Sequence, residues 1–203
     1  MTLARTATLA LALVMGGTGV WAQAVVGTAV VDGEKVTLFS NGTWEYVNPK
    51  AGDCKVLARN LAFCGSPQEW RRAANAPAHL TAQFIHGGAE YGQMLVEDIG
   101  LDQGLTFALM RQAALQYAGQ ASGQVPEEVP VFADDPIVVD GIDGITLVYL
   151  VDFRGTNVVF ANTILLTKGQ AMQLQTYVLG ADGYSEAHKR LHSEFIELIE
   201  VSQ

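Results

Sequence analysis

The stretch from Pro136 to Gly180 constrains the fold more than any other part of the chain. It holds three or four apolar runs that are rich in β-branched residues. Glycine-containing turns separate these runs at Asp140-Gly141, Asp143-Gly144, Arg154-Gly155 and Lys168-Gly169. Short apolar runs with this punctuation predict an antiparallel β-meander.

The last of these runs has the alternation of a strand with one buried face. Gln173, Gln175 and Tyr177 alternate with Met172, Leu174, Thr176 and Val178. A sheet with an apolar face needs a covering layer. The chain has 203 residues, 49% of them hydrophobic, which is enough for a full core without metals or oligomerisation. We therefore predict an α+β fold, in which helices flank an antiparallel sheet of about five or six strands.

The main domain is expected to span residues 62–203, and its first half supplies a helix and two strands. Ser66, Pro67 and Glu69 form the pattern of a helix start, which predicts a helix as far as about Ala74 with Trp70 buried. Residues 79–86 and 90–99 are expected to form two strands on either side of a glycine turn.

Two more helices are expected. Apolar residues recur over most of the surface of residues 105–117, which predicts a largely buried helix. The polar stretch 119–133 is expected to be a connection, and loops of this length are uncommon unless they are mobile or functional. Ser185 opens the last helix, which is expected to bury Ala187, Leu191 and Phe195.

The charge balance argues against nucleic acid and anionic lipid as partners. Twelve basic residues stand against 21 acidic ones, a net charge of -9. Such a surface repels phosphate groups. Two cysteines and four histidines leave few soft metal ligands, and the sequence contains no Cys-x-x-Cys pair.

The N-terminus has the pattern of a cleavable export signal. Arg5 precedes the apolar run 9–15, and Ala22-Gln23-Ala24 is a small-x-small motif, so cleavage is expected after Ala24 or after Ala22. The run is too short to span a bilayer, and an uncleaved anchor is the alternative. The first cysteine is Cys54, which argues against a lipoprotein. A periplasmic or secreted protein without a transmembrane segment in the mature chain is predicted.

Residues 25–48 are expected to form a small β-meander, followed by a linker over residues 49–61. Asp32-Gly33 and Asn41-Gly42 are strong hairpin signals. Residues 40–46 resemble a "DGTW-x-Y" hairpin motif of many exported bacterial proteins, a motif too short to imply an activity. Trp44 and Tyr46 lie on one face, where they either complete a small core or form a possible binding surface.

Cys54 and Cys64 have nine residues between them. In an exported protein this pair predicts a structural disulfide. The alternative is a reactive thiol pair, but no His or Lys-rich setting accompanies it.

The order of elements over residues 62–201 resembles the PsbP/Mog superfamily. The resemblance depends on Trp70 in the first expected helix, on Val96-Glu97-Asp98-Ile99-Gly100, on the glycine-turned meander and on Tyr184-Ser185-Glu186-Ala187-His188. It implies an α/β/α sandwich. Proteins of that group bind partners, and the familiar members are not enzymes. The resemblance therefore implies a binding module without naming its partner.

Several groups are candidates for chemistry, and each has a simpler explanation. His188 and His192 have the i, i+4 spacing of a helical metal site, but Lys189 and Arg190 stand between them, and solvated or core-edge histidines are favoured. Four aspartates near the meander have oxygen ligands for calcium, but turn formation explains them as well. These are Asp134, Asp135, Asp140 and Asp143.

Glu90, Glu97 and Asp98 lie on or beside the expected strands, where they are candidates to flank a pocket. No serine lies in a G-x-S-x-G elbow, and no phosphate-binding glycine loop is present. No catalytic, cofactor-binding or metal-binding residue is assigned from the sequence, and no cofactor is expected.

We therefore predict a non-catalytic binding or accessory protein of the envelope, whose partner is another envelope protein or a small ligand. The alternative is a metal-dependent or hydrolytic enzyme that uses His86, His188, His192 and nearby acidic residues. A purely structural stress or assembly factor is a third possibility.

Overall fold

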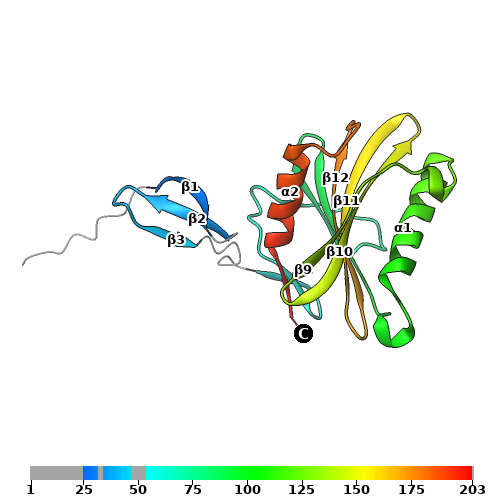
Figure 1. Ribbon diagram of the computed structural model, residues 1–203, viewed down its shortest axis with the longest axis horizontal. Helices are drawn as coiled ribbons and strands as arrows, with labels where there is room; N and C mark the ends of the chain where they lie inside the picture. Colours follow the sequence, from blue (N-terminus) through cyan, green and yellow to red (C-terminus); the bar gives the residue numbers. More distant parts are fainter. Residues whose placement is uncertain (1–24, 32–33, 47–53, 203) are drawn as a thin grey trace, which may run out of the picture. The chain divides into compact units, whose positions relative to one another are not determined.

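The computed structural model describes residues 25–31, 34–46 and 54–202 (Figure 1). The chain divides into two compact units, Met1–Val47 and Asn48–Gln203. The export signal, its two cleavage sites and the Asp32-Gly33 turn lie outside the described residues.

The N-terminal unit is a three-stranded antiparallel sheet. Its strands follow the chain in the order β1 (Val25–Val31), β2 (Glu34–Phe39) and β3 (Trp44–Tyr46). Gly42, with φ of 82°, takes the left-handed conformation that the turn before β3 requires. Asn41 Oδ1 accepts a hydrogen bond from the Thr43 backbone at 3.0 Å, which closes this turn.

The second unit is built on a seven-stranded antiparallel sheet, one or two strands larger than predicted. The strand order is β6-β7-β8-β12-β11-β10-β9. The strands are β6 (Arg71–Arg72), β7 (Ala82–Gly87), β8 (Glu90–Glu97), β9 (Val131–Val139), β10 (Ile142–Phe153), β11 (Thr156–Leu166) and β12 (Ala171–Leu179).

The meander predicted for residues 136–180 is present as β9 to β12, but the turn predicted at Asp143-Gly144 is wrong, because these residues lie within β10. The turns at Asp140-Gly141 and Arg154-Gly155 explain the register. Asp140 and Gly141 have φ of 50° and 78°, and Arg154 and Gly155 have φ of 56° and 88°. Two consecutive residues with positive φ match the twist of a two-residue hairpin. The predicted alternation in β12 is also confirmed, because Met172, Leu174 and Thr176 are buried while the residues between them are partly exposed.

The two faces of the sheet are covered differently. Helix α1 (Phe107–Ser122) lies on one face, and helix α2 (Glu186–Glu197) lies on the other (Figure 1). Contacts of α1 are mainly with β10 and β11, and those of α2 are with β12. A small sheet of order β13-β5-β4 joins α2 on its face, where its residues share one core with the helix. Its strands are β4 (Lys55–Ala58), β5 (Leu61–Phe63) and β13 (Ile199–Val201).

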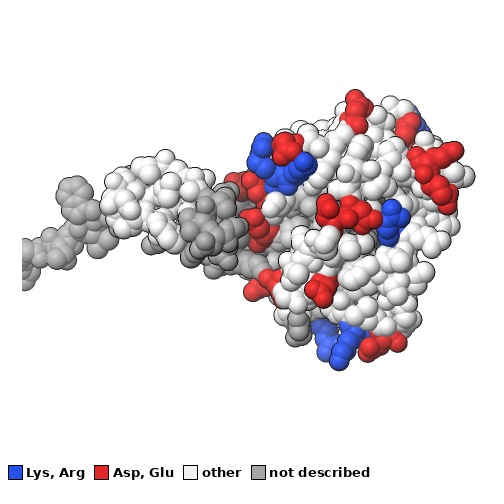
Figure 2. All heavy atoms as spheres, viewed as in Figure 1, with Lys and Arg blue, Asp and Glu red and all other residues white. Residues whose placement is uncertain are grey.

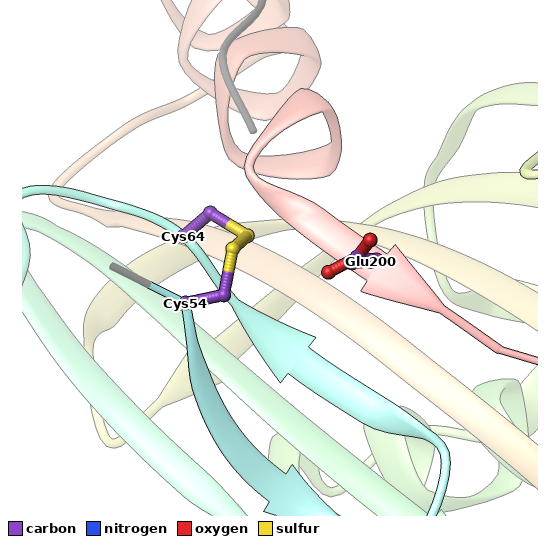
Figure 3. A group of neighbouring side chains, drawn as sticks. All are labelled: Cys54, Cys64 and Glu200. Atoms are coloured by element: carbon purple, nitrogen blue, oxygen red, sulfur yellow. A yellow bond between two sulfur atoms is a disulfide. The ribbon is translucent and has the colours of Figure 1, made fainter. Parts of the chain in front are cut away.

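The core beneath α2 is aromatic. The ring of Phe63 lies 4.2 Å from that of Phe84 and 5.7 Å from that of Phe195, and Trp70 lies 4.9 Å from Phe195. Beside this core, Cys54 and Cys64 are joined by a disulfide with an S–S distance of 2.05 Å (Figure 3). The linker predicted over residues 49–61 is wrong for residues 55–61, which form β4, the turn after it and the first residue of β5.

The helix predicted for residues 66–74 is wrong. Ser66 starts a single turn, in which its carbonyl oxygen accepts from the Glu69 and Trp70 backbone at 3.1 and 2.8 Å. The chain then leaves the turn because Arg71 and Arg72 pair with β7. The capping signature is local, and strand pairing overrides it. Trp70 is buried, as predicted.

The second predicted helix starts at Phe107 and continues to Ser122, so the connection predicted over residues 119–133 is shorter. Only the short 3-10 helix η2 (Pro126–Glu128) lies between α1 and β9. The helix is also less buried than predicted, because Leu109 and Tyr117 are 49% and 62% exposed. Because α1 is only partly buried against the sheet, a groove remains beside it.

Candidate binding groove

A groove of about 690 Å³ lies between α1 and the part of the sheet that α1 leaves uncovered. Its existence follows from dimensions. A helix with its side chains is about 10–12 Å wide, and strands lie about 4.7–4.9 Å apart. One helix therefore covers two or three of the seven strands. On the opposite face, α2 and the small sheet share the covering, whereas on this face no second element of that size accompanies α1 in the described part of the chain.

Aromatic side chains form one row across the sheet, and three of them, Tyr177, Phe160 and Tyr149, line the groove. The pairing of strands places Tyr91, Tyr177, Phe160 and Tyr149 opposite one another on β8, β12, β11 and β10. Tyr91 and Tyr177 stack at 4.9 Å with an interplanar angle of 5°, and Phe160 lies 5.1 Å from Tyr177 and 5.6 Å from Tyr149. The Tyr149–Phe160 pair is also stacked, at 11°, whereas Phe160 is tilted by 30° against Tyr177, so the row is a continuous run of ring contacts.

Amide side chains form a second row beside the aromatic one. Gln93 Nε2 donates to Gln175 Oε1, and Gln175 Nε2 donates to Gln173 Oε1 at 3.2 Å. Asn162 Nδ2 donates to the same Gln173 oxygen at 3.0 Å. At the β7 side, Gln83 Nε2 donates to the Tyr177 hydroxyl at 2.8 Å. An amide carries both donors and acceptors, so this row can bond to a ligand group of either kind.

The wall opposite the sheet is the inner side of α1. Met110, Ala113, Ala114 and Tyr117 line it. Because the two alanines are small, the space beside them stays open. Thr106 caps the helix by accepting from the Leu109 backbone at 3.2 Å, which fixes the start of this wall.

The lining is almost free of charge. Glu97 and His79 are its acidic and imidazole members, and among the described residues that line the groove none is Lys or Arg. Burial raises the pKa of the Tyr149 and Tyr177 hydroxyls, so both stay neutral at physiological pH. A ligand in this groove meets rings, aliphatic groups, amides and neutral hydroxyls.

His188 and His192 belong to α2 and face the other side of the sheet, where both are buried, in contrast to the solvated or core-edge position favoured by the sequence. His192 bonds through Nε2 to Thr163 at 2.8 Å and through Nδ1 to Thr176 at 2.9 Å. His188 Nε2 shares the Thr176 hydroxyl at 3.1 Å. Burial lowers the pKa of His188, and burial together with His188 lowers that of His192 to about 3. Neutral histidines in a hydroxyl network are a structural arrangement.

His86 belongs to a different pair. Its Nδ1 lies 2.9 Å from Glu90 Oε2, and its ring lies 4.5 Å from that of Trp70. The negative charge of Glu90 favours the protonated form of His188 and so opposes the effect of burial, but burial is the larger effect and the pKa of His188 is lowered overall. The three histidines thus share one side of the sheet, but they form no group of three ligand atoms within 4.8 Å in the part of the chain that the structure describes.

Within the described ranges the one group with that spacing is Cys54, Cys64 and Glu200 (Figure 3). Its two sulfur atoms are bonded to each other, so neither is a thiolate that can bind a metal.

The four aspartates of the meander separate. Asp134 pairs with Arg111 of α1 at 2.6 Å. Asp140 accepts from the Val201 backbone at 2.8 Å, at the end of the small sheet. Asp135 and Asp143 are exposed. In the described structure, no three of these carboxylates lie close enough together to bind one calcium ion.

The other residues named from the sequence have varied positions. Glu97 lines the groove and Asp98 bonds to Gln170 outside it. Trp44 is 45% exposed on the N-terminal sheet, and the Tyr46 side chain lies outside the described part. The groove residues Gln93, Phe160 and Tyr149 were missed, because the registers of β8 with β12, β12 with β11 and β11 with β10 are needed to bring them to one surface.

No protein-family model and no curated protein sequence matches the chain. In the described residues, no helix has the length and apolar character needed to cross a membrane.

Two solved structures of bacterial proteins are similar to this one. The first is the cyanobacterial PsbP protein CyanoP of Synechocystis, with 15% identity, a TM-score of 0.49, and coverage of 70% of this chain and 87% of that chain. The second is LpqN of Mycobacterium tuberculosis, a protein involved in cell envelope biogenesis, with 12% identity, a TM-score of 0.43, and coverage of 75% and 86%.

Proposed function

We propose that this chain is a non-catalytic binding protein of the bacterial envelope, periplasmic or secreted, and that it holds a small ligand in the groove beside α1. One observation carries the proposal: the sheet face left open by α1 carries the aligned aromatic and amide rows. The volume of about 690 Å³ lies within the range of small-molecule sites, about 300–1,000 Å³.

The lining favours binding over catalysis, because its imidazole and its carboxylate, His79 and Glu97, are both exposed. General acids and bases act within hydrogen-bond reach of the reacting atoms. His188 and His192, whose pKa values are lowered, belong to α2 and contact the opposite face of the sheet from the groove. The groove offers amides and hydroxyls, which orient a ligand without transferring protons at neutral pH.

The experiment is a comparison of two tryptophan substitutions on α1. Ala113 lines the groove, and Ala108 is exposed on the same helix outside it. Each protein is purified from the periplasm of a Gram-negative host, and native mass spectrometry measures retained small molecules. An uncharged fluorophore, N-phenyl-1-naphthylamine, measures groove binding in titrations.

Ala113→Trp is expected to weaken fluorophore binding by at least about tenfold, because an indole fills space that the ligand needs. Ala108→Trp should bind as the unchanged protein does. Equal binding by all three proteins would place the ligand elsewhere and refute the groove as the site.

A further inference from the structure

The amide, carboxylate and imidazole groups of the groove are gathered in one half of it. Along β12, the side chains facing the groove are Gln173, Gln175, Tyr177 and Leu179 in turn. Gln93 lies opposite Gln175, and Glu97 continues β8 beyond the level of Gln173. The Gln, Glu and His residues of the lining all belong to this half, where Leu80, Leu95, Ile99 and Leu105 flank them.

The other half is aromatic and aliphatic. Beyond Tyr177 and Phe160 it is lined by Val158, Phe153 and Leu179, without an amide or a charged group. Phe153 and Leu179 are each 38% exposed, so apolar surface reaches the solvent at this end. Exposed apolar side chains grouped on one surface are typical of binding sites.

The groove is also long. From Gln173 to Leu179 the strand advances six residues, which corresponds to about 20 Å. A ligand that uses both halves is therefore elongated, with a polar group at the Gln173 end and an apolar body toward Leu179.

The charges near the groove exclude a negative polar group. Glu97 is exposed at the polar end, and no lining residue carries a positive guanidinium or ammonium group within the described structure. The whole chain has a net charge of -9, and Figure 2 shows more acidic than basic atoms on the face drawn. An anionic headgroup would lose hydration without gaining an ion pair.

We infer that the groove binds a single-chain amphiphile with an uncharged, hydrogen-bonding headgroup, which lies on the amide row while the chain lies over the aromatic row toward Phe153 and Leu179. This inference rests on the proposed function and specifies its ligand class. The glutamine amides serve a headgroup that both donates and accepts, such as a carboxamide or a hydroxyl.

The test compares two probes that differ only in the headgroup. Dodecanamide and dodecanoate have the same chain length, and at pH 8 the first is neutral and the second is negative. Each is titrated against N-phenyl-1-naphthylamine bound to the mature protein, at low ionic strength and below micelle formation. Dodecanamide is expected to displace the fluorophore at a concentration at least about tenfold lower than dodecanoate does.

A charge reversal tests the orientation of the amphiphile. Glu97→Lys places a cation at the polar end, so the affinity for dodecanoate should rise about tenfold or more while that for dodecanamide changes little. Glu194→Lys makes the same change in net charge on the exposed side of α2, and it should leave both affinities unchanged.

The outcomes separate this inference from the proposed function. Equal displacement by both probes, tighter binding of dodecanoate, or equal effects of the two lysine variants would overturn the ligand class, while a loss of fluorophore binding in Ala113→Trp would still support the groove. If neither probe displaces the fluorophore although Ala113→Trp abolishes its binding, the groove stands and the amphiphile is refuted. If Ala113→Trp has no effect, the groove itself is refuted.

Discussion

At the scale of single residues, His192 shows how burial couples protonation to stability. Its two ring nitrogens are engaged by Thr163 and Thr176, and the residue is only 4% exposed. Below the pKa of an unfolded histidine, about 6.5, the imidazole of His192 is protonated in the unfolded chain but stays neutral in the folded chain. The lowered pKa therefore contributes stability that is complete above pH 6.5 and is lost as the pH falls toward 3.

We expect the free energy of unfolding to fall between pH 6.5 and pH 5 by up to about 1.4 kcal/mol per pH unit from this residue. His192→Gln should be less stable at pH 7 but should have a smaller pH dependence in this interval. Urea unfolding at several pH values measures both. His79→Gln removes an exposed histidine and should keep the original slope. A slope unchanged in His192→Gln would contradict the prediction.

At the scale of elements, the edge strand β9 combines exposed apolar residues with a proline. Phe132 and Val138 are 41% and 63% exposed, and among the described strands β9 pairs with β10 alone, so its other edge is unpaired there. Val139 pairs with Ile142 across the two-residue turn, so its backbone N–H and C=O bond to β10. In an antiparallel strand the bonding side changes with every residue, so the backbone groups of Val138, Pro136 and Asp134 point toward the unpaired edge. Pro136 lacks an N–H, which removes a donor from the middle of that edge.

Replacing this proline should permit pairing between the edges of two molecules. In a symmetric β9 to β9 contact, Pro136→Thr restores two hydrogen bonds, each contributing about 0.5–1.5 kcal/mol. We expect the dimer dissociation constant to decrease by about 10- to 100-fold. Sedimentation equilibrium measures it, and Val138→Thr, on the same edge with its N–H retained, is the control. A Pro136→Thr protein that remains as monomeric as Val138→Thr would refute this role of the proline.

At the scale of the whole molecule, export is a prediction with a direct test. The signal pattern in residues 1–24 predicts a mature protein that starts at Val25, or at Gln23 if cleavage follows Ala22. Expression of the full chain in a Gram-negative host, followed by intact-mass measurement of the periplasmic fraction, identifies the start. Recovery of the uncleaved chain with the membranes would instead indicate an anchor.

Features fixed by a few neighbouring residues were predictable from the sequence. The Asp140-Gly141 and Arg154-Gly155 turns, the Ser185 cap of α2 and the alternation in β12 are all present. Features that depend on distant partners were not. Residues 71–72 form a strand because β7 is beside them, and β5 forms between β4 and the C-terminal strand β13.

The groove belongs to the second kind. The alternation of Gln173, Gln175 and Tyr177 marked one face of β12 as polar, which was the available signal. That face becomes a site only when Gln93 and Phe160 are brought beside it by the register. The sequence contains turn signals for the register within the meander but none for the register of β8 with β12, so it pointed to one strand of the floor and not to the site.

The pairing of β8 with β12 has a consequence for the time course of folding. These adjacent strands are separated along the chain by three further strands and α1, and the bond between Gln93 and Gln175 joins positions 82 residues apart. Closing such a long loop is slow compared with forming a hairpin. The β7–β8 hairpin cannot pair with the meander until its partner strand β12 has been synthesised. If the chain is exported as the sequence predicts, a central sheet that closes late would keep the chain unfolded for longer before translocation.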